Sequence, residues 1–176
     1  PGSGKTSLAN IISRVFSGVE EEYHNTLQVQ RGWMRSDAIL GFDQVLNGRR
    51  QYDRFGFFKN LELFNKYDEL FQNKAFFAVL DEANLSPIEH YWSDFIGVTD
   101  KFYNGPQLLK YKSNSVTDGS DSSISVPKGL RFLATINVDS TTENLSDRFL
   151  SRSVFVRVEN PNDIQVGEEN LDLIKP

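Results

Sequence analysis

The chain has 176 residues, of which 39% are hydrophobic and 24% are charged, a balance that is ordinary for one globular domain with a substantial core. Its formal net charge of −5 argues against a basic nucleic-acid-binding surface on this segment, and the lack of cysteine excludes a disulfide framework. The longest purely apolar run, residues 75–80, is far too short to span a membrane. We therefore expect a cytoplasmic domain without membrane contact.

The first six residues, Pro1-Gly2-Ser3-Gly4-Lys5-Thr6, match the second half of the phosphate-binding pattern G-x-x-x-x-G-K-[ST]. In such a loop, backbone N–H groups surround the phosphates, the lysine reaches the β- and γ-phosphates, and the threonine hydroxyl ligates Mg²⁺. The pattern expects a further glycine and a β-strand before Pro1. A glycine-rich terminus with a chance lysine also fits these residues. Other parts of the chain are needed to distinguish it from a phosphate-binding loop.

Helical and strand-like patterns alternate along the first half of the chain. Apolar residues recur at helical spacing over 5–17, and residues 26–30 alternate as in a strand. Helices are predicted over 36–40 and 57–72, and the apolar run at 75–80 is typical of a strand buried on both faces of a parallel sheet. The apolar face of the first helix consists of Leu8, Ile11, Ile12, Val15 and Phe16.

A helix is also predicted after Pro87. Ser86 can cap its first turn and Glu89 can complete a capping box. The apolar residues that follow at helical spacing are expected in the core rather than around a cofactor. These residues are Ile88, Tyr91, Trp92, Phe95 and Ile96.

The second half contains a predicted hairpin and two further strands. The hairpin strands are expected at 107–112 and 123–126, and an apolar strand follows at 130–136. A short helix is predicted over 140–150 and a last strand over 153–158. Because strands alternate with helices, the pattern indicates an α/β fold with a parallel sheet.

Two acidic residues, Asp81 and Glu82, follow the buried strand at 75–80. An acid at this position beside a phosphate loop can hold the hydration shell of Mg²⁺, and the next acid can polarise an attacking water as a general base. Two surface acids at a strand end are the alternative interpretation. The spacing from the phosphate loop, about 75 residues with a strand between, favours the interpretation in which the two acids bind Mg²⁺ and activate water.

Polar and basic residues after the next apolar strand extend this set. Asn137 can orient the water or contact the γ-phosphate, although an asparagine after a strand is usually a turn residue. Arg148 and Arg152 follow, and an arginine supplied to a neighbouring subunit can stabilise charge on a transferred phosphoryl group. A surface ion pair with Asp147 is the alternative for these arginines.

Taken together, these elements resemble the Walker A, Walker B, sensor 1 and arginine-finger elements of an AAA+ ATPase. Two strings narrow the resemblance to the McrB-like branch, namely Asp81-Glu82-Ala83-Asn84-Leu85-Ser86 and Asn137-Val138-Asp139-Ser140-Thr141-Thr142. Further similarity lies in Gln30-Arg31-Gly32-Trp33, Ile39-Leu40-Gly41-Phe42, Glu89-His90-Tyr91 and Asp94-Phe95. The Walker elements are shared by many NTPases, whereas the two longer strings are more specific.

The resemblance implies a site that hydrolyses ATP or GTP with Mg²⁺. Thr6 and Asp81 would bind the metal, Glu82 would be the general base, and Asn137 would sense the γ-phosphate. Arg152 or Arg148 would reach the nucleotide of a neighbouring subunit. Arg152 is preferred because it aligns when the Asn-Val-Asp-x-Thr-Thr string is held in register. The implied cofactor-binding residues are Gly2, Ser3, Gly4, Lys5, Thr6, Ser7 and Asp81.

The resemblance also implies the AAA+ three-layer sandwich, a P-loop NTPase fold with a mostly parallel sheet and a β-hairpin insertion before the sensor 1 strand. Residues 1–158 would form the core domain, truncated inside Walker A, and residues 159–176 a linker toward a helical lid. The sequence lacks the first strand and the lid, so we expect residues 1–176 alone to bind nucleotide weakly.

The McrB-like branch contains motor subunits of modification-dependent restriction systems and related phage-defence ATPases. It implies a homo-oligomeric ring (a hexamer), a McrC-like nuclease partner, and DNA contact only through other domains or the ring pore. A MoxR-like or dynein-related chaperone that remodels a protein partner is an alternative, as is a non-hydrolysing nucleotide-dependent assembly module. The choice between ATP and GTP stays open, because base-reading residues normally lie upstream of the loop and in the lid.

Overall fold

A computed structural model of the chain describes residues 4–17, 24–41, 54–67, 75–98, 107–111, 122–139 and 142–158. Predictions for residues 1–3, 18–23, 68–74 and 159–176 lie outside the described residues. No helix in the described ranges is long and apolar enough to cross a membrane.

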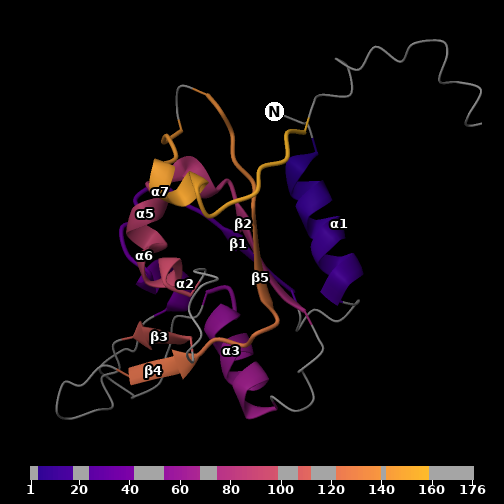
Figure 1. Ribbon diagram of the computed structural model, residues 1–176, viewed down its shortest axis with the longest axis vertical. Coiled ribbons are helices and arrows are strands. Elements are labelled where there is room, and N and C mark those ends of the chain that lie inside the picture. Colours follow the sequence, from indigo (N-terminus) through magenta and orange to yellow (C-terminus); the bar gives the residue numbers. More distant parts are fainter. Residues whose placement is uncertain are drawn as a thin grey trace, which may run out of the picture.

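The main sheet has three parallel strands in the order β1-β2-β5 (Figure 1). They are β1 (His24–Gln28), β2 (Phe76–Asp81) and β5 (Leu130–Ala134). Leu80 of the central strand lies opposite Leu27 on one side and Ala134 on the other. Residues 76–80 are all buried, which confirms the prediction of a strand buried on both faces.

Helices cover both faces of this sheet, so the fold is mixed α/β, as the alternating pattern predicts (Figure 1). Side chains of β2 alternate between the faces, so that Phe76, Ala78 and Leu80 enter the main core while Phe77 and Val79 point the other way. One face is covered by α1 (Lys5–Ser17). The other is covered by α2 (Asp37–Leu40), α3 (Phe57–Lys66), α5 (Ile88–Tyr91) and α6 (Ser93–Ile96).

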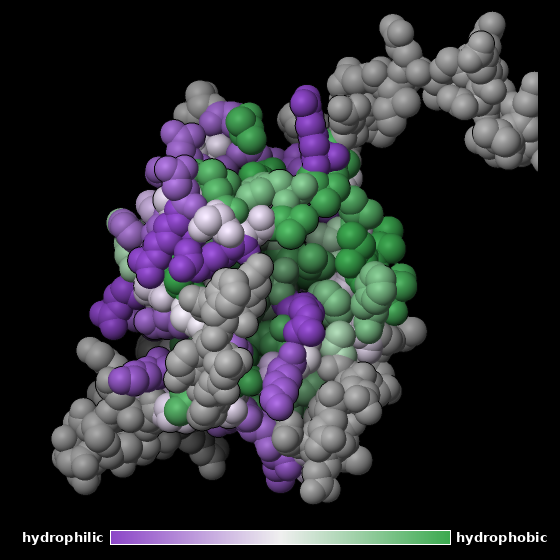
Figure 2. Space-filling model, viewed as in Figure 1, coloured by the Kyte–Doolittle hydropathy of each residue, from purple (hydrophilic) through white to green (hydrophobic). Residues whose placement is uncertain are grey.

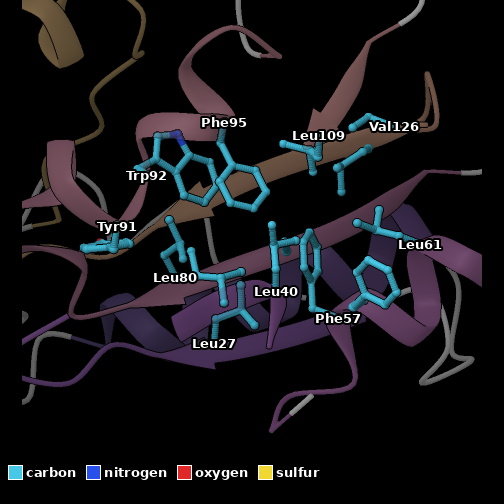
Figure 3. Close-up of a cluster of buried hydrophobic side chains, with 14 of the residues drawn as sticks. Leu27, Leu40, Phe57, Leu61, Leu80, Tyr91, Trp92, Phe95, Leu109 and Val126 are labelled. Carbon is cyan, nitrogen blue, oxygen red and sulfur yellow. The ribbon is translucent and has the colours of Figure 1, made fainter. Parts of the chain in front are cut away.

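Aromatic side chains fill the core between the sheet and the shorter helices (Figure 3). The rings of Trp92 and Phe95 stack with centroids 4.4 Å apart, and Phe57 stacks on Phe76 at 5.9 Å. The aromatic residues predicted at helical spacing are therefore core residues. The single predicted helix is divided at Trp92, whose backbone separates α5 from α6.

The predicted hairpin before the last sheet strand is confirmed. Its strands, β3 (Leu108–Tyr111) and β4 (Ser122–Ser125), pair antiparallel, with Leu109 opposite Ile124. Both of these side chains are buried in the main core, so the hairpin is packed onto the domain.

The predicted apolar face of α1 is exposed, which the periodicity alone does not indicate. The helix has the predicted bounds, but the residues it buries are the small ones, Ala9, Ser13 and Ser17. They bring the helix close to the strands, and the hydroxyl of Ser13 lies 2.7 Å from Nδ1 of His24. The exposed apolar side chains, from 40% to 71% accessible, are those of Leu8, Ile11, Val15 and Phe16, and Figure 2 shows hydrophobic surface gathered over this helix.

Three other local predictions are wrong. Of the helix predicted over 140–150, the described residues 142–150 are helical only in α7 (Asp147–Leu150), because the backbone of Glu143 bonds to Asn84 instead of to a helical turn. Residues 153–158 form no strand, since no described strand pairs with them. Ser86 caps no helix, because its buried hydroxyl donates to the carbonyl of Gln30 at 2.8 Å.

Candidate functional site

The candidate site lies at the edge of the sheet where the parallel strands end. Asp81 is the last residue of β2, and Thr135 and Asn137 follow β5, so the shared direction of the strands brings these residues together. The first turn of α1 reaches the same edge. There the N–H of Leu8 donates to the carbonyl of Gly4 at 2.8 Å and closes the start of the helix.

The carboxylate of Asp81 joins three elements. Its Oδ1 accepts a hydrogen bond of 2.7 Å from the hydroxyl of Thr6 at the start of α1, 75 residues earlier in the chain. The same oxygen accepts a second bond of 2.7 Å from the hydroxyl of Thr135, which follows β5. The predicted Walker A and Walker B residues, Thr6 and Asp81, are therefore in direct contact.

Thr135 also holds the backbone of the second acid. Its side chain is 6% exposed, and its hydroxyl accepts the N–H of Glu82 at 2.9 Å while it donates to Asp81. The carbonyl of Thr135 accepts the N–H of Ala83 at 2.8 Å. The sequence predicted no role for Thr135, because a single sequence does not show that its hydroxyl lies level with Asp81 and Glu82 on the neighbouring strand.

Glu82 has a left-handed backbone with φ 54° and ψ 47°, and it is the one non-glycine residue with positive φ among those described. Such a conformation costs a side-chain-bearing residue about 1–2 kcal/mol, and it concentrates at functional sites. The turn ends β2 and carries the Glu82 side chain to Asn137. The amide Nδ2 of Asn137 lies 3.4 Å from Oε1 of Glu82, so the structure brings these two predicted residues together.

The described part of the predicted phosphate loop has a backbone that suits glycine. Gly4 has φ +76°, a conformation that strains other residues, and nothing lies within 4 Å of the position where a Cβ would be. Lys5 begins α1 and is half-buried, and Ser7 is exposed on its first turn. The predicted residues Gly2 and Ser3 lie outside the described residues.

A loop after β5 closes on itself and on Asn84. The hydroxyl of Thr142 donates to the carbonyls of Asn137 and Asp139, at 3.0 and 3.1 Å. The side-chain amide of Asn84 also donates to this loop, to the carbonyls of Asn137 and Glu143. Asn84 belongs to the first of the two specific sequence strings and Thr142 to the second, and both side chains donate to the carbonyl of Asn137. The strings alone do not show this shared acceptor.

Among the described residues, neither Arg148 nor Arg152 forms a side-chain hydrogen bond or ion pair with the residues at this edge. Both are exposed, on α7 and directly after it, and a guanidinium nitrogen of Arg152 donates to the carbonyl of Arg148 at 2.9 Å. In the described part of the chain, neither forms an ion pair with Asp147. Their side chains are thus not brought to the Asp81 site of the same chain.

A carboxylate fixes the start of the helix that carries Arg148. The N–H of Ser146, which caps α7, donates to Oε1 of Glu89 at 3.1 Å. Partial burial raises the pKa of the Glu89 carboxyl. Hydrogen bonds from the hydroxyl of Ser146, the N–H of Glu89 itself and the N–H of Ser146, together with the charge of His90, outweigh it and leave the pKa below its ordinary value. Glu89 is therefore charged at neutral pH and holds α7 as a carboxylate.

The residues at the sheet edge fit Mg²⁺ held together with a nucleotide. Magnesium takes oxygen ligands and is usually bound by one or two protein groups plus phosphate oxygens. The Thr6 hydroxyl gives its only proton to Asp81, so its lone pairs stay available to a cation. Within the described residues, no three or more His, Cys, Asp or Glu side chains cluster to hold a metal by themselves.

Comparisons with protein-family models and with curated proteins find no match to this chain.

Proposed function

We propose that the chain is the core of an AAA+ P-loop NTPase that hydrolyses ATP or GTP, on the pattern of the McrB-like motors. The observation that carries the proposal is the 2.7 Å hydrogen bond from Thr6 to Asp81. It joins the residue that would follow the phosphate-binding lysine to the acid at the end of the central strand. The alternative interpretation, a glycine-rich terminus with a chance lysine, does not account for a helix that begins at Lys5 beside this acid.

The side chains then take complementary roles. Lys5 and the N-terminal end of α1 attract the phosphates, because the first helical N–H groups and the helix dipole favour anions. Mg²⁺, when bound with the nucleotide, offsets negative charge on the β- and γ-phosphate oxygens. Glu82 accepts the proton of the attacking water, and the amide of Asn137 beside it orients that water against the γ-phosphate. Because both arginines are exposed and neither is bonded to the described residues of its own site, either suits a nucleotide on a neighbouring subunit.

The replacement Glu82→Gln in the full-length protein tests the proposal. It removes the base and keeps the size of the side chain, so turnover of ATP or GTP should fall about 100-fold or more. The affinity for a fluorescent nucleotide should change by less than about threefold, because the replacement removes no contact with the phosphates and leaves the phosphate loop unaltered.

Glu62→Gln is the matched control, since Glu62 is exposed on α3. It should hydrolyse nucleotide at the unmodified rate. Phosphate release by Glu82→Gln at the unmodified rate would contradict the assignment. Nucleotide binding without turnover by the unmodified protein would favour the assembly module instead.

A further inference from the structure

The side chain of Asn84 is a buried amide at the candidate site with most of its hydrogen-bonding capacity in use. It is 4% exposed and lies two residues after Glu82. Its Oδ1 accepts the N–H of Asn137 at 3.1 Å, and its Nδ2 donates to the carbonyl of Asn137 at 2.6 Å. Nδ2 also donates to the carbonyl of Glu143 at 3.2 Å.

The two bonds to Asn137 hold both the N–H and the C=O of one residue. A side-chain amide that grips a residue at both points restricts rotation of its backbone, and the direction of its side chain is then restricted as well. The side chain held in this way is the amide that lies 3.4 Å from the carboxylate of Glu82. Asn84 is therefore linked to Glu82 through Asn137.

Asn84 is itself firmly held. It lies in the short 3₁₀ helix η2 (Ala83–Leu85), and the buried hydroxyl of Tyr91 donates to the carbonyl of Ala83 at 2.6 Å. The carbonyl of Asn84 accepts the N–H of Glu143 at 2.9 Å. The turn after β2 and the loop after β5 thus form one hydrogen-bonded unit around this amide.

We propose that Asn84 is a positioning residue that fixes the amide of Asn137 beside Glu82. The inference rests on the proposed hydrolytic function, in which these two side chains place the attacking water. Without the Asn84 amide, Asn137 leaves its position while the phosphate loop and Asp81 stay in place. Loss of Asn84 therefore lowers kcat and leaves nucleotide affinity unchanged.

The test compares Asn84→Ala with Asn25→Ala in the full-length protein. Asn25 is a suitable control because its amide is also buried and also holds a distant segment, donating to the carbonyl of Phe55 at 2.7 Å. Both replacements should lower the melting temperature. Only Asn84→Ala should lower kcat, by about 10- to 100-fold, with the Kd of a non-hydrolysable nucleotide within about threefold of the unmodified value.

A double-mutant cycle separates positioning from a general loss of structure. If Asn84 acts through Asn137, then adding Asn84→Ala to Asn137→Ala should lower kcat by less than about twofold further. Effects that multiply in the double variant, or normal kcat in Asn84→Ala, would overturn the inference. If Asn84→Ala does not fold, Asn84→Asp takes its place, since it has nearly the same size and keeps the acceptor oxygen.

Failure of this inference differs from failure of the proposed function. An unmodified protein that hydrolyses neither ATP nor GTP removes the proposed function and this inference together. An active unmodified protein with a fully active Asn84→Ala variant removes this inference alone.

Discussion

The hydroxyl of Thr135 donates to the same carboxylate oxygen of Asp81 that accepts the hydroxyl of Thr6, and it also receives the N–H of Glu82. One buried hydroxyl therefore links the two acids at the end of β2 to the neighbouring strand. Replacement by valine keeps the shape of the side chain and removes both bonds.

Thr135→Val should destabilise the domain by about 1–3 kcal/mol, because a buried N–H and a carboxylate oxygen each lose a partner. Urea unfolding measures this change. Thr135→Ser keeps the hydroxyl and should recover most of the stability and, in the full-length protein, most of the turnover. A valine variant as stable as the unmodified protein, or a serine variant no more stable than the valine variant, would contradict this role of the hydroxyl.

The left-handed backbone of Glu82 predicts an unusual order of stability. Glu82→Gly should be more stable than Glu82→Ala by about 1 kcal/mol, because glycine adopts positive φ without strain. Glu62, inside helix α3, provides the opposite case, where glycine should be less stable than alanine by about 1 kcal/mol. Chemical denaturation of the four variants checks both signs, and equal stabilities of the two Glu82 variants would argue against the left-handed turn.

His24 predicts a loss of stability in mild acid. Burial, and then the nearby positive charge of Arg14, lower the pKa of His24 below its ordinary value of 6.5. Between the lowered pKa and about 6.5, the unfolded chain binds more protons than the folded one, so the free energy of unfolding falls as the pH falls. That loss begins near pH 6.5 and is complete below the folded pKa.

The variant His24→Gln removes this titration, so its stability should depend less on pH between about 6.5 and 5. Melting curves across this range measure the difference. A His24→Gln variant whose stability falls with pH as steeply as that of the unmodified protein would show that other groups cause the loss.

The orientation of α1 reverses the usual rule for a helix. Ser13→Leu should destabilise by about 1–3 kcal/mol or more, because a large side chain is forced against the strands. Ile11→Ser, on the exposed face, should change stability by less than about 0.5 kcal/mol. Thermal or urea unfolding of the two variants decides the orientation, and a larger loss for Ile11→Ser would show that the apolar face is the buried one.

Local sequence patterns predict a helix or strand well where burial of apolar side chains is the main interaction that determines it. The apolar residues 76–80 can only be a buried strand, and the aromatic residues of α5 and α6 have no other place than the core. The acids after β2 and Asn137 after β5 could be assigned to one sheet edge because parallel strands end together. This part of the site follows from order along the chain.

The rest depends on partners that are distant in sequence. The period of α1 is correct, but periodicity does not show which face meets the strands, and the bond from Ser13 to His24 lies between two elements. Residues 153–158 alternate like a strand, yet a strand needs a neighbour to bond with. Asn84 and Thr135 gain their roles from residues more than 50 positions away, as the separations of 53 and 54 residues in their bonds to Asn137 and Asp81 show.

Because α1 buries mainly Ala9, Ser13 and Ser17, it is attached to the sheet through little apolar area. By contrast, β2 is bonded on both sides along its length. Amide hydrogens of α1 should therefore exchange with solvent sooner than those of β2. A ligand that contacts both Thr6 and Asp81 would bridge this weakly attached helix and the strand that is bonded on both sides, so its binding should slow exchange in α1 more than in β2.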